Sequence, residues 1–295
     1  MNGLFLVDKP ENMTSFGVVA RLRRLTGEKC GHSGTLDPLA TGLLPVMVGK
    51  STKLCELFTA GRKGYIGTLR FGLCTDTGDI TGQVLGEQEG MPTEEEFRAI
   101  LPQFLGAIEQ RPPAYSAIKV NGVPLYKLAR AGKEVEIPTR TVEIHRLELL
   151  SFDAEKKEAV LEVECSKGTY IRSLFMDMAE ALGCLGTMSA LRRTKSGRFS
   201  LENAIPLEEL MRRLEEGNAE DLITPAEALD FLPRFEPQDF FATLMRNGCE
   251  IAVRKMKNVP DTLCCVYKHE ELIGLGHQFE KDGEALFKVV THLWE

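Results

Sequence analysis

The stretch GHSGTLDPLATGLLP, residues 31–45, sets a single carboxylate, Asp37, directly before a proline and among glycines. Proline fixes φ near −65°, and glycine adopts backbone conformations that other residues avoid. The stretch therefore predicts a loop whose backbone is held in place before anything binds to it. An aspartate before a proline often does no more than cap a turn. The rest of the sequence has to decide whether Asp37 is a turn residue or a reactive group.

The composition is that of an ordinary globular protein with enough apolar residues for a core. The chain has 295 residues, of which 43% are hydrophobic and 27% are charged. This length exceeds that of a usual single domain, so we expect a large domain at residues 1–230 and a smaller one at 231–295. The apolar run near the N-terminus is too short for a signal peptide or a membrane span, which favours a cytoplasmic protein without membrane contact.

The net charge of −7 argues against a protein that coats nucleic acid without specificity. The charge is unevenly distributed. The charged residues within 202–227 are mainly acidic, whereas short basic clusters occur at 21–24, 62–63, 127–130 and 192–198. Basic clusters of this kind usually form a solvated surface. They indicate a nucleic-acid site only where they surround a candidate pocket.

Hydrophobic periodicity predicts an α+β fold. Strands are expected at residues 3–8, 43–48, 64–72, 141–152 and 158–166. Helices are expected from Ser15 to Gly27, over 51–59, from a capping box at Thr93, between Pro124 and Gly132, from Tyr170 to Gly183 and over 207–216. These elements alternate without a regular βαβ order, which favours a mixed sheet. After residue 230, a short helix at 239–248 and strands near 263–269, 271–279 and 284–290 predict a small β-rich module.

Two short motifs suggest other enzyme classes, and each lacks a residue that its chemistry needs. GLLPVMVGKS ends like a phosphate-binding loop, but Leu44 stands where that loop requires its first glycine. The sequence DTG at 76–78 matches an aspartic-protease signature, yet no second such triplet supplies the partner carboxylate. No G-x-S-x-G motif is present, which argues against a serine hydrolase of that type.

The eight cysteines include no C-x-x-C pair, so the usual zinc spacing is absent and reduced core cysteines are expected. Cys264 and Cys265 are adjacent in an apolar run and should point to opposite faces of a strand. Cys265, His269 and His277 remain as one alternative set of metal ligands.

Two further segments supply an aromatic ring and a cation that a lone aspartate could use. Tyr65 follows Arg62 and Lys63 at the start of a predicted strand, and a ring beside cations suits an unstacked nucleobase with its phosphates. A tyrosine in a strand can equally belong to the core. Arg172 lies where a strand passes into a helix, so it can project into a crevice and pair with a carboxylate in bidentate fashion.

No second catalytic acid at a clear spacing is evident, although glycoside hydrolysis usually needs one. A lone Asp37 that faces Tyr65 could attack a reactive centre or stabilise that centre, while the leaving group stays trapped in the site. Arg172 would keep the carboxylate ionised by holding the pKa of Asp37 down.

Four motifs occur in a fixed order: DKP at 8–10, GHSGTLDPLATGLLPVMVGKSTK at 31–53, KGYIGTLRFGLCTDTGDITGQV at 63–84 and VECSKGTYIRSL at 163–174. In these motifs the chain closely resembles the pseudouridine synthases of the bacterial type that modify tRNA. ALRRTKSGRFSLENAI at 190–205 is similar to that family's segment before the C-terminal part. The resemblance covers residues 3–206 well, and the end of the chain more weakly resembles a PUA-type RNA-binding module.

The resemblance implies a mixed-sheet catalytic domain with a PUA-like module. The implied reaction converts a uridine in the T loop of elongator tRNAs, position 55, to pseudouridine without a cofactor or a metal. Asp37 would be the nucleophile, Tyr65 would stack on the target uracil and Arg172 would pair with Asp37. The implied partner is the tRNA T arm, with no obligate protein partner and a monomeric enzyme. The residues implied to contact the RNA or shape its pocket are His32, Tyr170, Leu191 and Asp79.

Two other functions fit parts of the sequence. A non-catalytic RNA-binding or RNA-chaperone protein could use the same basic clusters and the C-terminal module. A hydrolase could use the same aspartate, and it would release free uracil. The combination of Asp37, Tyr65 and Arg172 favours the synthase, because RNA binding alone does not need it.

Overall fold

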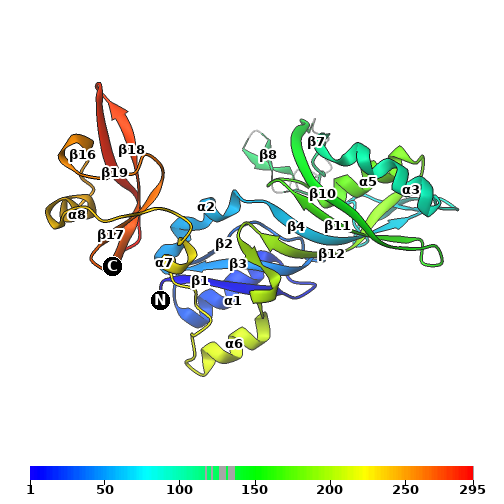
Figure 1. Ribbon diagram of the computed structural model, residues 1–295. Coiled ribbons are helices and arrows are strands. Elements are labelled where there is room, and N and C mark those ends of the chain that lie inside the picture. Colours follow the sequence, from blue (N-terminus) through cyan, green and yellow to red (C-terminus); the bar gives the residue numbers. More distant parts are fainter. Residues whose placement is uncertain (117, 121, 126–130, 132–136, 295) are drawn as a thin grey trace.

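The computed structural model describes residues 1–116, 118–120, 122–125, 131 and 137–294, and most of its strands lie in two sheets (Figure 1). The larger sheet has ten strands within these ranges. In spatial order its main path is Ile205–Pro206 (β14), Gly3–Lys9 (β1), Thr41–Val48 (β3), Gly186–Ser196 (β12), Lys63–Phe71 (β4), Glu158–Cys165 (β11), Arg140–Asp153 (β10) and Gly106–Gln110 (β7). Cys30–His32 (β2) pairs with β3, and Phe199–Ser200 (β13) pairs with β12.

The second sheet is small and antiparallel apart from its first pair of strands. Its order is Arg234–Phe235 (β15), Cys264–Lys268 (β17), Glu271–Lys281 (β18), Glu284–His292 (β19) and Ile251–Ala252 (β16). Two separate two-stranded ribbons are formed by Leu73–Thr75 (β5) with Val84–Glu87 (β6), and by Lys119–Val120 (β8) with Val123–Pro124 (β9).

The described helices are short and pack at the edges and on the faces of these sheets (Figure 1). The α-helices are Ser15–Thr26 (α1), Cys55–Thr59 (α2), Glu94–Ile100 (α3), Ile171–Ala181 (α5), Leu207–Glu215 (α6), Pro225–Ala228 (α7) and Asp239–Arg246 (α8). The 3-10 helices are Gly49–Leu54 (η1), Leu101–Phe104 (η2), Leu201–Asn203 (η3) and Val253–Lys255 (η4). No helix among the described residues is long and apolar enough to cross a membrane.

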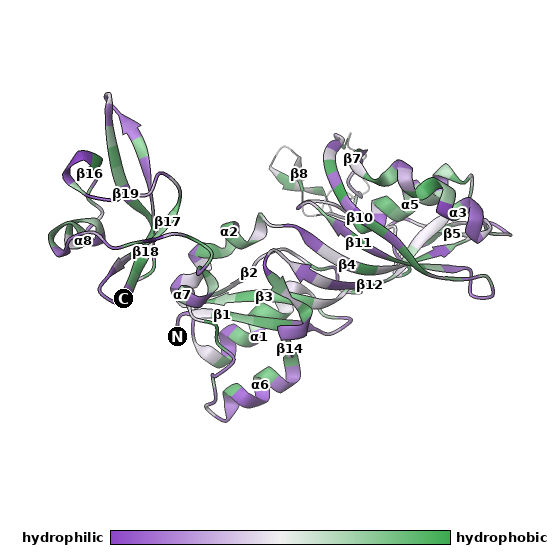
Figure 2. Ribbon diagram, in the orientation of Figure 1, coloured by the Kyte–Doolittle hydropathy of each residue, from purple (hydrophilic) through white to green (hydrophobic). Residues whose placement is uncertain are grey.

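The large sheet carries two hydrophobic cores, one at each end. Phe71, Leu161 and Phe175 belong to the core that β4, β11 and α5 share. Phe5 and Leu22 belong to the core between β1, β3, α1 and α6. Figure 2 shows β1 and β3 as mainly hydrophobic strands, whereas α6 carries many hydrophilic residues. β12 lies between β3 and β4, and therefore at the centre of the sheet between the strands of the two cores.

The small sheet contacts the large one through a third apolar cluster. Leu4 and Met47 of the large sheet share this cluster with Cys265 and Leu275 of the small one. Cys264, the neighbour of Cys265, belongs instead to the core inside the small module. The prediction that these two cysteines point to opposite faces of a strand is therefore confirmed.

The predicted α+β class is confirmed, and so are the strongest local signals. Thr93 and Glu96 form the predicted capping box, and Gly27 ends α1 in the left-handed conformation. The helix predicted at 51–59 begins as the 3-10 turn η1 and becomes α-helical only at α2. Val48 makes no side-chain cap bond there, and the first two backbone N–H groups of η1 donate instead to the backbone oxygen of Lys29 and to Oδ1 of Asn2. The helix predicted between Pro124 and Gly132 lies outside the described residues.

Gly42 shows why the opening stretch needs its glycines. Its φ is +98°, a conformation that favours glycine. It pairs with Arg193 of β12, and a Cβ atom on Gly42 would lie 2.4 Å from the backbone oxygen of Arg193. The stretch therefore leaves its loop and enters β3 at a point where only a residue without a side chain fits against β12.

Replacing Gly42 with alanine should destabilise the fold for two separable reasons. The left-handed conformation costs about 1–2 kcal/mol, and overpacking against β12 adds about 1–3 kcal/mol. Gly27→Ala is the matched control, because φ at Gly27 is +71° and nothing lies within 4 Å of the added Cβ. Urea denaturation of both variants measures the two losses of unfolding free energy. Equal losses would show that β12 does not constrain Gly42.

Candidate active site

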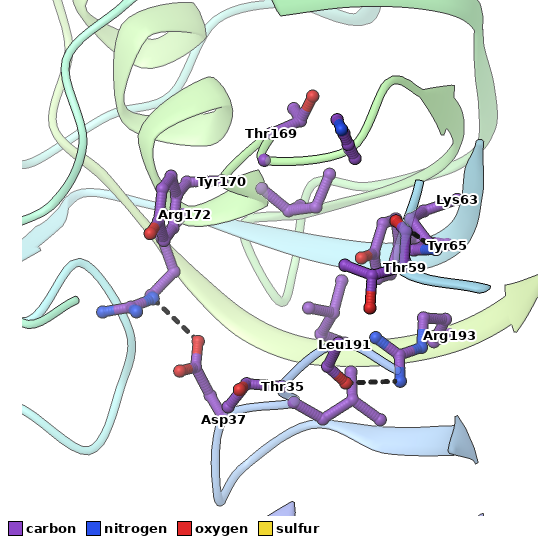
Figure 3. A pocket seen from close by; sticks show the side chains of 15 residues that line it. Thr35, Asp37, Thr59, Lys63, Tyr65, Thr169, Tyr170, Arg172, Leu191 and Arg193 are labelled. Atoms are coloured by element: carbon purple, nitrogen blue, oxygen red, sulfur yellow. Dashed lines mark hydrogen bonds and ion pairs between the residues drawn. The ribbon is translucent and has the colours of Figure 1, made fainter. Parts of the chain in front are cut away.

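A cavity of about 270 Å³ opens between the loop that precedes β3, the start of β4, the N-terminus of α5 and β12 (Figure 3). Asp37 and Arg172 lie on one side of it, and Lys63, Tyr65 and Arg193 lie on the other, with Leu191 between them (Figure 3). The complete lining is Gly34, Thr35, Leu36, Asp37, Thr59, Lys63, Tyr65, Lys167, Gly168, Thr169, Tyr170, Ile171, Arg172, Leu191 and Arg193.

Asp37 is held by an ion pair with Arg172. The Nε atom of Arg172 lies 3.0 Å from Oδ2 of Asp37. Its Nη1 donates to the backbone oxygen of Thr77 at 2.7 Å, and its Nη2 donates to that of Tyr115 at 3.1 Å. Arg172 is buried at the start of α5, although a charged side chain is more often exposed. The expected bidentate pairing is not present, because both terminal nitrogens donate to backbone oxygens.

The backbone around Asp37 is anchored on both sides. Before it, the Leu36 backbone N–H donates to the Ser15 hydroxyl at 2.8 Å, and that hydroxyl donates to the Leu36 oxygen at 3.1 Å. After it, the oxygen of Pro38 accepts from the ammonium group of Lys9 at 3.3 Å. Lys9 is completely buried, with its other donors on the oxygens of Pro10 and Met13. The carboxylate therefore sits on a preorganised segment.

Burial and charge act in opposite directions on Asp37. Removal from water raises the pKa of the Asp37 carboxyl above its usual value, and the Asp79 charge raises it further. The charges of Arg172 and Lys9 and the hydrogen bond from Arg172 lower the pKa of Asp37, but by less. Arg172 lowers the pKa of Asp37 as expected, but desolvation outweighs the ion pair, so the net shift of this pKa is upward.

Tyr65 projects from β4 into the opposite side of the cavity and is 8% exposed. Burial raises the pKa of its phenol. The positive charge of Arg193 opposes this rise in the pKa of Tyr65. The ring is thus a partly open apolar face with a cation behind its hydroxyl group, an arrangement that suits a stacked base.

The other residues expected at the site fall into two groups. Tyr170 precedes α5 and lines the cavity, where the Arg140 guanidinium lies 5.6 Å from the centre of its ring, and Leu191 lines it from β12. Asp79 and His32 do not line the cavity.

Asp79 is buried behind Arg172. Its Oδ2 lies 3.9 Å from Nε of Arg172, and its Oδ1 accepts from the hydroxyls of Thr77 and Thr81. The carboxylate is therefore placed to support Arg172 and not to touch a molecule in the cavity.

His32 ends β2 opposite Val46 of β3, just before the loop that carries Asp37. Its Nδ1 is buried and has no hydrogen-bond partner among the described residues. Burial and the charge of Arg193 lower the pKa of His32, which favours its neutral form.

Sequence reasoning named Lys63 only as a cation beside Tyr65 and Arg193 only as a member of a basic cluster, and it did not place either of them in the cavity wall. Lys63 is 5% exposed, and burial together with the Arg193 charge lowers its pKa to about 8. Alternation along the strands could have revealed both cations. Lys63 shares a face of β4 with Tyr65, and Arg193 shares a face of β12 with Leu191.

The alternative set of metal ligands is not brought together. The Cys265 thiol donates to the backbone oxygen of Leu229 in an apolar cluster. His269 is exposed and lies 3.5 Å from Asp239. The described residues contain no group of three or more histidine, cysteine or acidic side chains that could hold a metal ion.

Comparison with known proteins gives consistent matches along the whole chain. The model of the TruB family pseudouridylate synthase N-terminal domain matches residues 23–171, and that of the tRNA pseudouridylate synthase B C-terminal domain matches 172–229. The tRNA pseudouridine synthase B of Clostridium tetani is 43% identical over 99% of this chain and 100% of its own length. The corresponding protein of Alkaliphilus oremlandii is 39% identical over 100% and 99%.

Solved structures of lower identity share the fold. An H/ACA RNP bound to a substrate RNA containing 2′-deoxyuridine has a chain with a TM-score of 0.72 at 26% identity, covering 99% of this chain and 85% of that chain. A Cbf5–Nop10–Gar1 complex has a TM-score of 0.72 at 27% identity, covering 96% and 83%.

The pKa of Asp37 should respond to Arg172 in a direction that titration can measure. Carbon-13 NMR of carboxyl-labelled aspartate, assigned with Asp37→Asn, should show Asp37 protonating above its usual pKa of 3.8. Arg172→Gln removes the largest lowering influence, so the Asp37 pKa should rise further. Arg172→Lys keeps the charge and is the control. A fall in the pKa of Asp37 on Arg172→Gln would contradict this electrostatic account.

Proposed function

Because this chain belongs to the TruB family of pseudouridylate synthases, we propose that it isomerises the uridine at position 55 in the T loop of elongator tRNAs, with Asp37 as the nucleophile. The observation that carries this proposal is the position of Asp37. It is the one carboxylate lining the cavity among the described residues, and it faces an aromatic ring. Relatives that match nearly the whole chain are named tRNA pseudouridine synthase B.

The reaction rearranges the bonds of one nucleotide and conserves its atoms, so it requires no cofactor. The bond from ribose C1′ to uracil N1 breaks, a bond from C1′ to C5 forms, C5 loses its proton and N1 gains one. The target uridine must first leave its stack, which costs a few kcal/mol. A loop uridine is a favourable target, because loop bases are splayed out at lower cost.

Each side of the cavity has its own task in this proposal. The ionised Asp37 reacts at the base or the sugar, or assists elimination at the sugar, while its anchored backbone fixes its approach. Arg172 orients the carboxylate through the 3.0 Å contact with Oδ2. On the other side, Tyr65 stacks on the uracil and holds it while it rotates after detachment.

The remaining residues serve the RNA and the shape of the pocket. Leu191 and Tyr170 form the walls around the uracil. His32, which precedes the Asp37 loop on β2, contacts the RNA and helps to hold the target base out of its loop. Asp79 supports the guanidinium of Arg172 from behind.

The division of labour along the chain follows from the two sheets. Residues 1–230 form the catalytic domain in this proposal, and residues 231–295 form an RNA-binding module. The start of the second sheet at β15, Arg234–Phe235, supports this boundary. The enzyme acts on the T arm as a cytoplasmic monomer without an obligate protein partner.

Asp37→Asn should bind tRNA normally and form no product. A T-arm stem-loop with 5-tritiated uridine reports the loss of the C5 proton, and the variant should release tritium about 10⁴-fold more slowly than the native protein. Asp230→Asn is the control, because Asp230 pairs with Arg198 at the surface. Full release by Asp37→Asn would end the assignment. Free uracil among the products would indicate a hydrolase, and binding without tritium release from the native protein would indicate an RNA-binding protein.

Tyr65→Phe should keep the affinity for the T arm, because the phenyl ring retains the stacking surface. Loss of the hydroxyl should lower the rate of tritium release in a single turnover. Filter binding and rapid quench measure the two effects separately. Complete loss of RNA binding would contradict a stacking role for this ring.

A further inference from the structure

Gln110 is a fully buried polar side chain that the proposed reaction does not yet use. It is the last residue of β7, at one edge of the large sheet, and it is 0% exposed. A buried amide group is costly unless its donor and acceptor atoms are paired, so its partners require an explanation. In the β10–β7 pairing, Gln110 lies directly opposite Arg140.

The Gln110 amide binds the backbone of Tyr170 twice. Its Oε1 accepts from the Tyr170 N–H at 2.7 Å, and its Nε2 donates to the Tyr170 backbone oxygen at 3.0 Å. Tyr170 is the N-cap residue of α5 and makes no side-chain cap bond of its own. The first N–H groups of a helix have no partner within that helix. Gln110 therefore holds the start of α5 from a strand that lies 60 residues earlier in the chain.

The chain that follows β7 also contacts the first turn of α5. The Ser173 hydroxyl donates to the backbone oxygen of Arg111 at 2.8 Å. Nη2 of Arg172 donates to the backbone oxygen of Tyr115 at 3.1 Å. Hydrogen bonds from residues 110–115 thus fix the beginning of α5 at several points.

Two side chains of the cavity depend on this contact. Arg172 presents its Nε to Asp37 while its terminal nitrogens donate to backbone oxygens, so the place where α5 begins decides where Nε lies. The ring of Tyr170 lies 5.6 Å from the guanidinium of Arg140, the residue opposite Gln110. The end of β7 and its partner strand β10 therefore contact both the backbone and the ring of Tyr170.

We infer that Gln110 is a positioning residue, which holds the backbone of Tyr170 and thereby places the guanidinium of Arg172 against Asp37. Gln110 does not line the cavity, so it acts through α5 and not on the RNA. The inference rests on the proposed function and adds a residue to its machinery. A purely structural Gln110 would change the free energy of unfolding and leave the contact between Arg172 and Asp37 as it is.

Gln110→Met removes both hydrogen bonds and keeps nearly the same side-chain volume. Single-turnover release of tritium from the T-arm stem-loop should slow by about tenfold or more, because a small misplacement of a catalytic group is costly. The affinity for the stem-loop should change less than about threefold. Release at the native rate would overturn the inference.

Gln88→Met is the matched control for the loss of two such bonds on α5. Gln88 accepts from the Leu185 N–H at 2.8 Å and donates to the Gly183 oxygen at 3.3 Å, beyond the other end of the helix. This variant should release tritium at the native rate. Equal slowing in Gln88→Met and Gln110→Met would overturn the inference, because it would show that any loosening of α5 has the same effect.

The titration of Asp37 separates positioning from general stabilisation. Carbon-13 NMR of carboxyl-labelled aspartate should show the pKa of Asp37 rising in Gln110→Met, because a displaced Arg172 lowers this pKa less. In an Arg172→Gln background, Gln110→Met should leave the Asp37 pKa unchanged. An unchanged pKa in the single variant, or an equal rise in the two backgrounds, would contradict the inference.

Gln110→Glu provides a second variant if Gln110→Met does not fold. An ionised carboxylate accepts from the Tyr170 N–H but cannot donate to the Tyr170 oxygen, whereas the protonated acid does both. Relative to the native protein at each pH, this variant should release tritium faster as the pH falls and the introduced carboxyl group takes up its proton. A ratio that does not vary with pH would contradict the inference. Absence of tritium release from the native protein would instead refute the proposed function, and the Asp37 titration would still test Gln110.

Discussion

The pairing of β12 with two strands at once is the constraint on which the site depends. Its hydrogen bonds to β4 run from Gly186 to Ser196, and near Arg192 and Arg193 it also pairs with β3. This arrangement brings the loop before β3 next to the beginning of β4, although β12 lies between these two strands in the sheet. The close approach at Gly42 sets the path of the chain out of the Asp37 loop. A shift of β12 by one residue would move Leu191 and Arg193 to the other face.

The cavity combines one carboxylate with an excess of positive charge. Lys63, Arg172 and Arg193 are all nearly buried, and only Arg172 forms an ion pair with Asp37. Burial raises the pKa of Asp37 and lowers that of Lys63, so the protein environment brings both groups closer to neutrality than water would. Such perturbed groups are typical of sites that do chemistry. The excess of positive charge also suits a polyanionic RNA backbone at the mouth of the cavity.

The arrangement supports the proposal that the single aspartate of the cavity, Asp37, is the nucleophile of this pseudouridylate synthase. The reaction needs no bound cofactor, so its demands fall on position and on retention of the detached base. The anchored loop supplies the first, through the bonds of Ser15 and Lys9 on either side of Asp37. In the proposed reaction, the cavity wall of Tyr65 and Leu191 would retain the detached base. Arg193 lies between these two parts, since it donates to the backbone oxygen of Gly34 in the loop and lies opposite Tyr65 in the β12–β4 pairing.

The sequence by itself determined the α+β class, most helices and strands, and the three residues Asp37, Tyr65 and Arg172 as a set. These signals are local: periodicity, capping residues and turn chemistry act within a few positions, and the motifs carry the family resemblance. The tertiary structure alone decided the roles of Lys63 and Arg193, which in sequence are ordinary members of basic clusters. It also decided that burial outweighs the charge of Arg172 in shifting the pKa of Asp37. Burial depends on which distant strands cover a residue, and β12 reaches the loop only after about 150 intervening residues, as the 150-residue separation of the Arg193–Leu43 bond shows.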